Sequence, residues 1–108
     1  MRCKHILVYD LTIFSLPSEG QTELQKVQSI PLPFTEPKWG QATDDGKNVL
    51  ITGLVDDTRS VFKVDLESGK SSKAFSWLDR PFETFSYHEG EDLVFLGHDQ
   101  GVTAFRAA

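Results

Sequence analysis

The sequence predicts an all-β fold built from short antiparallel strands. Two observations support this prediction: a repeat with a period of 44 residues, and two apolar runs in each copy of the repeat. Four pairs of identical or similar residues are separated by this period: Pro37 and Pro81, Gly46 and Gly90, Val49 and Leu93, and Gly53 and Gly97. A period of this length is typical of proteins that stack copies of one supersecondary unit.

The first apolar run of each copy is "VLIT" at 49–52 and "LVFL" at 93–96, and a third copy, "ILVY" at 6–9, lies 43 residues before the first of these. Runs that are apolar throughout, without alternation, are typical of short strands covered on both faces. A polar turn and a second apolar run follow each of them, at 13–16, 61–64 and 102–105. Strand, turn and strand predict a hairpin.

Outer strands complete the unit. The segments 38–43 and 82–87 precede two hairpins, and we expect Gly46 and Gly90 to supply positive φ at the turns between them. The segment 70–77 follows as a polar outer strand. Four antiparallel strands per period predict β-propeller-type blades, here about two and a half blades with ten strands.

We therefore divide the chain into a partial blade at 4–33, a complete blade at 37–78 and a partial blade at 81–107. The first blade includes a segment in which Leu24, Val27 and Ile30 also fit a helical turn, and we favour a strand there because nearby prolines limit any helix. Such a set of blades leaves open edges. We expect either a homo-oligomeric ring or the remainder of a longer propeller to close it, with a small sandwich or barrel as the alternative.

The blade sequences also resemble known repeats. "EDLVFLGHDQGVTAFRAA" and "SVFKVDLESGKSSKAFSW" are similar to the blades of PQQ-like (quinoprotein-like) propellers, and "PKWGQATDDGKNVLITG" resembles the blade opening of TolB-like and WD-type propellers. The resemblance covers most of residues 37–106 and implies a propeller fold. It implies no quinone, because no residue matches a quinone ligand, and His98 after Gly97 departs from the WD pattern, in which Gly-His precedes the first strand.

The sequence Gly69-Lys70-Ser71 ends like a phosphate-binding loop. Such a loop needs a glycine five residues earlier, where this chain has Val64, and a helix afterwards, where 70–77 has no apolar stripe at helical spacing. We interpret this segment as a turn with Gly69 in a left-handed conformation.

Composition excludes several classes of function. The net charge of -5 and the lack of a Lys/Arg cluster argue against a nucleic-acid binder, and no apolar stretch approaches the length of a membrane span. Cys3 is the single cysteine, so no internal disulfide forms, and the apolar run after the basic start is shorter than a signal core. We expect a cytoplasmic protein.

Chemistry-bearing residues are few. His88-Glu89 and His98-Asp99 have metal-binding side chains, but they fall in turns at opposite ends of a blade. No G-x-S-x-G or comparable motif accompanies the serines, and Cys3 lies near the start of the chain as an inert thiol. We expect no catalytic residue, no metal and no cofactor.

Binding is the remaining class, because loops on a rigid scaffold commonly carry it. The turns inside the hairpins and the connections between blades lie on one rim of a propeller, and the candidate partner-binding residues there are Asp10, Asp56, Asp57, Arg59, Asp79, Arg80, His98 and Asp99. We expect a non-catalytic scaffold that binds a protein or peptide with a basic surface. The alternatives are an enzyme subunit with a composite site at the centre of a ring, and a small acidic inhibitor of a basic site.

Overall fold

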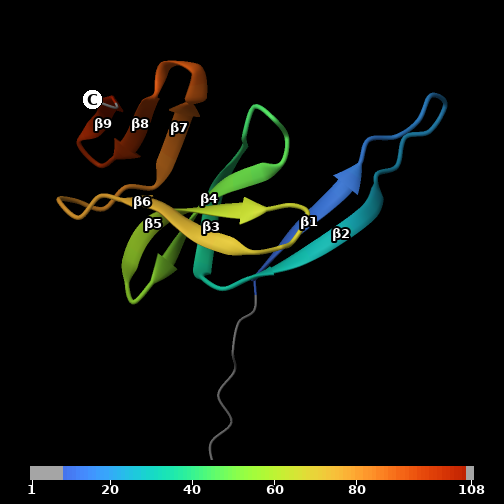
Figure 1. Cartoon of the computed structure of the whole chain (residues 1–108), viewed down its shortest axis with the longest axis horizontal. Coiled ribbons are helices and arrows are strands. Elements are labelled where there is room, and N and C mark those ends of the chain that lie inside the picture. Colours follow the sequence, from blue (N-terminus) through green and yellow to red (C-terminus); the bar gives the residue numbers. More distant parts are fainter. Residues whose placement is uncertain (1–8, 107–108) are drawn as a thin grey trace, which may run out of the picture.

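The computed structural model describes residues 9–106 and is all-β, with three antiparallel sheets (Figure 1). Sheet I pairs β1 (Tyr9–Ser15) with β2 (Gln25–Leu32). Sheet II contains β3 (Thr35–Ala42), β4 (Asn48–Val55), β5 (Thr58–Asp65) and β6 (Ser71–Ser76). Sheet III contains β7 (Thr84–His88), β8 (Leu93–His98) and β9 (Gly101–Arg106), with a single 3-10 turn, Glu89–Glu91, between β7 and β8.

Sheet II lies between the other two sheets and is covered on both faces. On one face Ile51 and Phe62 pack in a cluster with Ile30 of sheet I. On the other face Leu50 and Val61 pack in a second cluster with residues of sheet III. The prediction that the continuous apolar runs form strands with two buried faces is therefore confirmed for the run at 49–52.

The strand predictions for β2 and β6 are also confirmed. The segment around Val27 and Ile30 is a strand, and the residues after Lys70 form β6, so no helix follows the Gly-Lys-Ser sequence. The first predicted strand, at 6–9, lies outside the described residues except for Tyr9, which begins β1. No helix in the described part of the chain is long and apolar enough to cross a bilayer.

The repeat itself differs from the predicted one by a single residue. The cross-strand pair Gly40 and Ile51 of sheet II corresponds to the pair Phe85 and Leu96 of sheet III, a separation of 45 residues. Adjacent residues of a strand point to opposite faces, so the predicted period of 44 matches residues on opposite faces. Gly53 accordingly shares the face of Ile51 that packs on sheet I, whereas Gly97 lies on the face opposite to Leu96.

Backbone conformation at the turns agrees with the sequence in part. Gly46 (φ 71°) and Gly69 (φ 75°) are left-handed as predicted. The prediction for Gly90 is wrong, because the left-handed residue of that turn is Asp92 (φ 47°), which ends the 3-10 turn. Asp10 was expected in a turn but lies within β1 opposite Pro31, because β1 begins earlier than the apolar run at 13–16 suggested.

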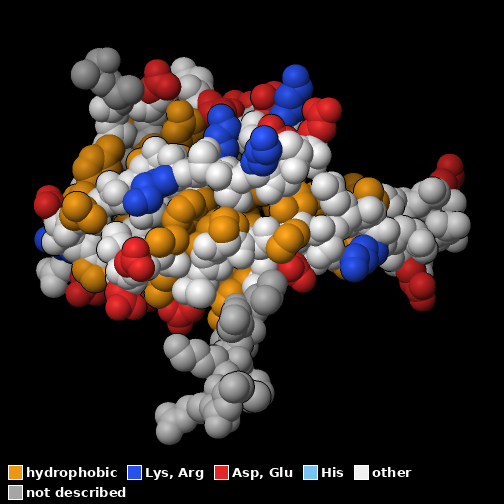
Figure 2. All heavy atoms as spheres, turned by 60° about the horizontal axis from the view of Figure 1, so that its bottom comes forward, with side chains coloured by type: hydrophobic (Ala, Val, Ile, Leu, Met, Phe, Trp, Pro, Cys, Tyr) orange, Lys and Arg blue, Asp and Glu red, His pale blue; other side chains and the backbone are white. Residues whose placement is uncertain are grey.

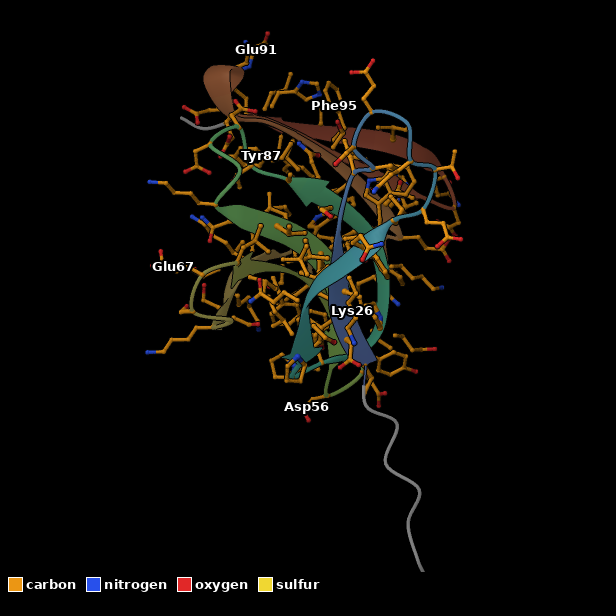
Figure 3. The ribbon with its side chains drawn as sticks, turned by 90° about the vertical axis from the view of Figure 1, so that its right-hand side faces the viewer. Lys26, Asp56, Glu67, Tyr87, Glu91 and Phe95 are labelled. Atoms are coloured by element: carbon orange, nitrogen blue, oxygen red, sulfur yellow. The ribbon has the colours of Figure 1, made fainter. Side chains whose placement is uncertain are left out.

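Each sheet has two ends, and the turns divide between them. The rim end carries the turn 56–57 between β4 and β5, the connection 77–83 between β6 and β7, and the turn 99–100 between β8 and β9. The far end carries the turns 43–47, 66–70 and 89–92. Figure 3 shows Asp56 of the rim end and Glu91 of the far end at opposite extremes of the molecule.

Candidate functional site

Two hollows that share one lining residue lie at the rim end, and together we call them the rim groove. They have volumes of about 300 Å³ and about 450 Å³ and share Pro81. The smaller hollow lies between β4–β5 and the 77–83 connection, and the larger one lies between that connection and the start of the turn 99–100. The charged and aromatic residues that line the rim groove are Asp57, Arg59, Trp77, Asp79, Arg80, Glu83, His98 and Asp99.

Six of the eight predicted rim residues line this groove, and two do not. Asp56 lies at the tip of the β4–β5 turn and points away from the sheet (Figure 3). Asp10 lines neither hollow, because it is part of β1 in sheet I, whereas both hollows lie on sheets II and III. The rim groove therefore belongs to the two C-terminal sheets.

The turn at Asp56 and Asp57 is strained. Both residues are left-handed, with φ of 51° and 62°, in a two-residue hairpin turn of the kind that usually carries Asn-Gly. Strained turns of non-glycine residues persist where the surrounding structure holds them, and they occur often at binding sites. Both side chains are exposed, and that of Asp57 lines the groove.

The two arginines of the rim groove are held by neutral acceptors. Arg59 Nη1 donates to the carbonyl of Glu36 at 3.1 Å and to Thr52 Oγ1 at 3.3 Å. The guanidinium of Arg80 lies over the Trp77 ring, 5.8 Å from its centroid, and its Nη1 is 3.4 Å from His98 Nδ1. Neither arginine neutralises a carboxylate of the groove.

His98 supports the groove instead of presenting its ring to a partner. Its side chain is 4% exposed, so the expectation of an exposed binding residue is wrong. Nδ1 accepts from the Gln100 backbone N–H at 3.1 Å, and Nε2 lies 2.8 Å from Thr103 Oγ1. The ring also packs edge-on against Trp77, with centroids 5.6 Å apart, because His98 shares the face of Leu96 that is directed toward sheet II.

Two acidic residues of the far end, Asp45 and Asp65, are used by the fold itself. Asp45 Oδ1 accepts from Thr43 Oγ1 at 2.6 Å and from the Lys47 backbone N–H at 2.9 Å. Asp65 Oδ1 accepts from the backbone N–H groups of Ser68 at 3.0 Å and Glu67 at 2.8 Å.

These bonds lower two pKa values. The hydrogen bond from Thr43, and then that from Lys47, lower the pKa of Asp45. The backbone hydrogen bonds from Ser68 and then Glu67 lower the pKa of Asp65. Hydrogen bonds to the ionised form are the physical cause in both turns.

The acidic residues of the rim end are free by comparison. In residues 9–106 no lysine or arginine lies within ion-pairing distance of a carboxylate, and the one histidine–carboxylate contact joins His98 Nδ1 to Asp99 Oδ1 at 3.9 Å, with the Asp99 side chain 82% exposed. No described residue donates a hydrogen bond to the carboxylates of Asp56, Asp57 or Asp79. Figure 2 shows Asp and Glu side chains along the lower left border of the molecule, with hydrophobic side chains exposed among them.

Sequence reasoning missed the apolar part of the groove. Trp77 and Leu78, the latter 79% exposed, lie beside Asp79 and Arg80 in the connection from β6 to β7. The sequence "WLDRP" at 77–81 indicates this apolar part, because it places two large apolar residues in a connection that is predicted to lie on the rim. An aromatic side chain next to exposed carboxylates is a common feature of sites that bind cationic side chains.

No described group of three or more His, Cys, Asp or Glu side chains has a metal-binding arrangement, and His88 and His98 lie at opposite ends of sheet III.

Comparison with known proteins adds no assignment: no family model, no curated protein and no solved structure matches this chain.

Proposed function

We propose that this protein is a non-catalytic interaction scaffold that binds a basic segment of a partner protein in the rim groove. The proposal rests on a difference in hydrogen bonding between the carboxylates of the groove and those of two far-end turns. Acidic turn residues often serve only the conformation of their own turn, as Asp45 and Asp65 do. Asp57 and Asp79 have no such partner in the described structure, so their charges remain available to a ligand.

The groove suits an arginine or lysine side chain. Carboxylates from three separate connections line its two hollows: Asp57 and Asp79 line the smaller one and Asp99 lines the larger one. Trp77 supplies an aromatic surface in the same groove. A cation placed there gains electrostatic attraction to these carboxylates without breaking a Lys or Arg ion pair with them. The Trp77 ring already contacts the Arg80 guanidinium, which an incoming cation would have to displace in order to contact the ring.

A propeller-type assembly is part of the proposal. Three features are what consecutive blades would give. The sheets have two, four and three strands in chain order, sheet II is covered on both faces, and equivalent strand pairs of sheets II and III are 45 residues apart. In such an assembly the rim end would form one continuous binding surface with the rims of further blades, whether these come from other copies of the chain or from a longer protein.

A peptide titration with two matched variants tests the function. The probe is a nonapeptide of alternating arginine and glycine, and the reporter is Trp77 fluorescence in a Trp39→Phe background, since the chain contains two tryptophans. The rim variant changes three groove residues: Asp57→Asn, Asp79→Asn and Asp99→Asn. The control variant makes the same change in net charge with three exposed far-end residues: Glu67→Gln, Glu91→Gln and Asp92→Asn.

We expect the rim variant to bind the probe about tenfold more weakly, which corresponds to three exposed charge contacts of a few tenths of a kcal/mol each. The control variant should bind within about twofold of the parent, and binding should weaken with added salt. Equal losses in both variants would show that net charge alone attracts the peptide, and unchanged binding in the rim variant would exclude the groove.

A further inference from the structure

The outer edge of sheet III is open in the described structure. β9 pairs with β8 along its whole length, and no described strand lies on its other side. The carbonyl of Gly97 accepts from the Glu83 N–H at 2.9 Å, so it points toward β7 and away from β9. Hydrogen-bonded and non-hydrogen-bonded pairs alternate along an antiparallel ladder, so Val102 and Ala104 direct their N–H and C=O groups to the open edge.

This edge lacks the features that protect the other outer edge. β6, the outer strand of sheet II, has an irregular register opposite Val61 and Phe62 and carries Lys73. Bulges and lysines are the devices with which proteins discourage strand addition. β9 pairs without any irregularity, contains no proline, and has a single charged residue, Arg106, at its last position.

An apolar hollow of about 220 Å³ adjoins β9. Its walls come from the end of β6 and from the face of sheet III that packs on sheet II: Phe75, Ser76, Trp77, Val94, Leu96 and Phe105. Leu96 also belongs to the buried cluster between these sheets, so the hollow continues an existing interface. Phe105 is 40% exposed there and packs edge-on against Trp77, with centroids 5.1 Å apart.

We propose that sheet III binds an extended segment of a partner polypeptide as a fourth strand, antiparallel to β9. The open N–H and C=O groups of Val102 and Ala104 would pair with its backbone. Side chains of one face of a strand recur at every second residue. Because Phe105 faces the hollow, a strand beside β9 would direct one apolar side chain, aromatic or branched aliphatic, into the hollow against Trp77. Sheet II provides the precedent, since β6 occupies the corresponding place beside β5.

A peptide selection tests this proposal. Random linear nonapeptides displayed on phage are selected on the complete chain, and the enriched peptides are synthesised and titrated. We expect enriched sequences with apolar residues at alternating positions. In the free protein the amides of Val102 and Ala104 should exchange rapidly with solvent, and bound peptide should protect both.

Three variants locate the binding site. Ala104→Pro removes one outward N–H, and proline is tolerated on an edge strand; we expect it to weaken binding about threefold to tenfold, the value of one backbone hydrogen bond. Ala104→Thr is its matched control, because it keeps the amide and a strand-forming residue, and should bind like the parent. Phe105→Glu places a charge in the hollow and should lower affinity at least as much, with circular dichroism confirming the fold of each variant.

Selection without enrichment over an unrelated protein, equal binding by the Ala104→Pro and Ala104→Thr variants, or protection mapped to other strands would overturn the proposal. The rim variant at Asp57, Asp79 and Asp99 should retain these peptides, because they contact the edge and the hollow. Failure of rim binding and failure of strand addition are thus separate outcomes.

Discussion

The two ends of the sheets are both acidic, yet they use their carboxylates differently. At the far end Asp45 and Asp65 accept hydrogen bonds from their own turns, and Glu89 Oε2 accepts from the Asp44 backbone N–H at 2.7 Å. At the rim end Asp57 and Asp79 accept none within the described chain. Three far-end carboxylates therefore stabilise the fold, whereas Asp57 and Asp79 at the rim end have no such role in the described chain.

The far end also holds two sheets together. The side-chain amide of Gln41 in β3 donates to the Tyr87 carbonyl of β7 at 2.5 Å and accepts from the Tyr87 N–H at 2.9 Å. At the rim end the two sheets meet instead through the Trp77, Arg80 and His98 side chains. Sheets II and III are thus joined by a two-way side-chain-to-backbone hydrogen-bond contact at the far end and by contacts between side chains at the rim end.

The largest effect on stability is expected at the Gln41 contact. Gln41→Ala leaves the Tyr87 N–H and C=O without their partners, which should lower the free energy of unfolding by about 1–3 kcal/mol. Urea denaturation measures the loss, and hydrogen exchange at the Tyr87 amide shows where it arises. A loss below about 0.5 kcal/mol would mean that the far end does not hold the sheets together.

The next prediction concerns turn residues and has opposite signs at the two ends. Gly46→Ala at the far end forces a Cβ into a left-handed conformation and should destabilise the protein by about 1 kcal/mol. Asp57→Gly at the rim end relieves such a conformation and should stabilise it by about 0.5 kcal/mol, while weakening the binding of the arginine probe. Thermal unfolding measures both, and changes of the same sign would contradict the comparison.

The smallest effect concerns pH. The pKa values of Asp45 and Asp65 are lowered below their ordinary value of 3.8, so their ionised forms contribute stability that is present above that value and is lost as pH falls through the folded-state pKa. Asp65→Asn should therefore cost stability at pH 6 and much less at pH 2.5, whereas Asp57→Asn should cost little at either pH. Denaturant titrations at the two values provide the check, and a pH-independent cost at Asp65 would rule out this role of the charge.

Much of the fold followed from local patterns. The apolar runs at 49–52 and 61–64, with the Asp56-Asp57 turn in the segment between them, specify the β4–β5 hairpin by themselves. The left-handed conformation of Gly46 and Gly69 was also predictable from the sequence. Each glycine ends a polar tripeptide, Asp-Asp-Gly or Glu-Ser-Gly, in a predicted turn.

The period of the repeat was wrong for a definite reason. A run that is apolar throughout carries no alternation, so letters alone do not show which residues face which neighbour. Gly53 is small because the Phe34 ring lies where its Cβ would be, whereas Gly97 lies beside the Thr84 side chain. The two glycines match in sequence, but they lie on different faces of their sheets and contact different side chains.

The site was predictable in its location and less so in its content. Assigning the turns to one rim placed Asp57, Asp79 and Asp99 at the same end of the sheets from topology alone. His98 is buried because it lies on the face of β8 that is directed toward sheet II and because its ring contacts Trp77. Neither feature can be predicted from the residues next to His98 in the sequence. Whether a carboxylate is free or bonded likewise depends on backbone N–H directions within a turn.

Backbone amide chemical shifts recorded while the arginine–glycine peptide is added test the central claim most directly. We predict shift changes concentrated in residues 54–59, 77–83 and 97–100, the segments that form the rim groove. Residues 43–47 and 66–70 at the far end should not change, although they are also acidic. Changes of equal size at both ends, or changes confined to the far end, would contradict the account.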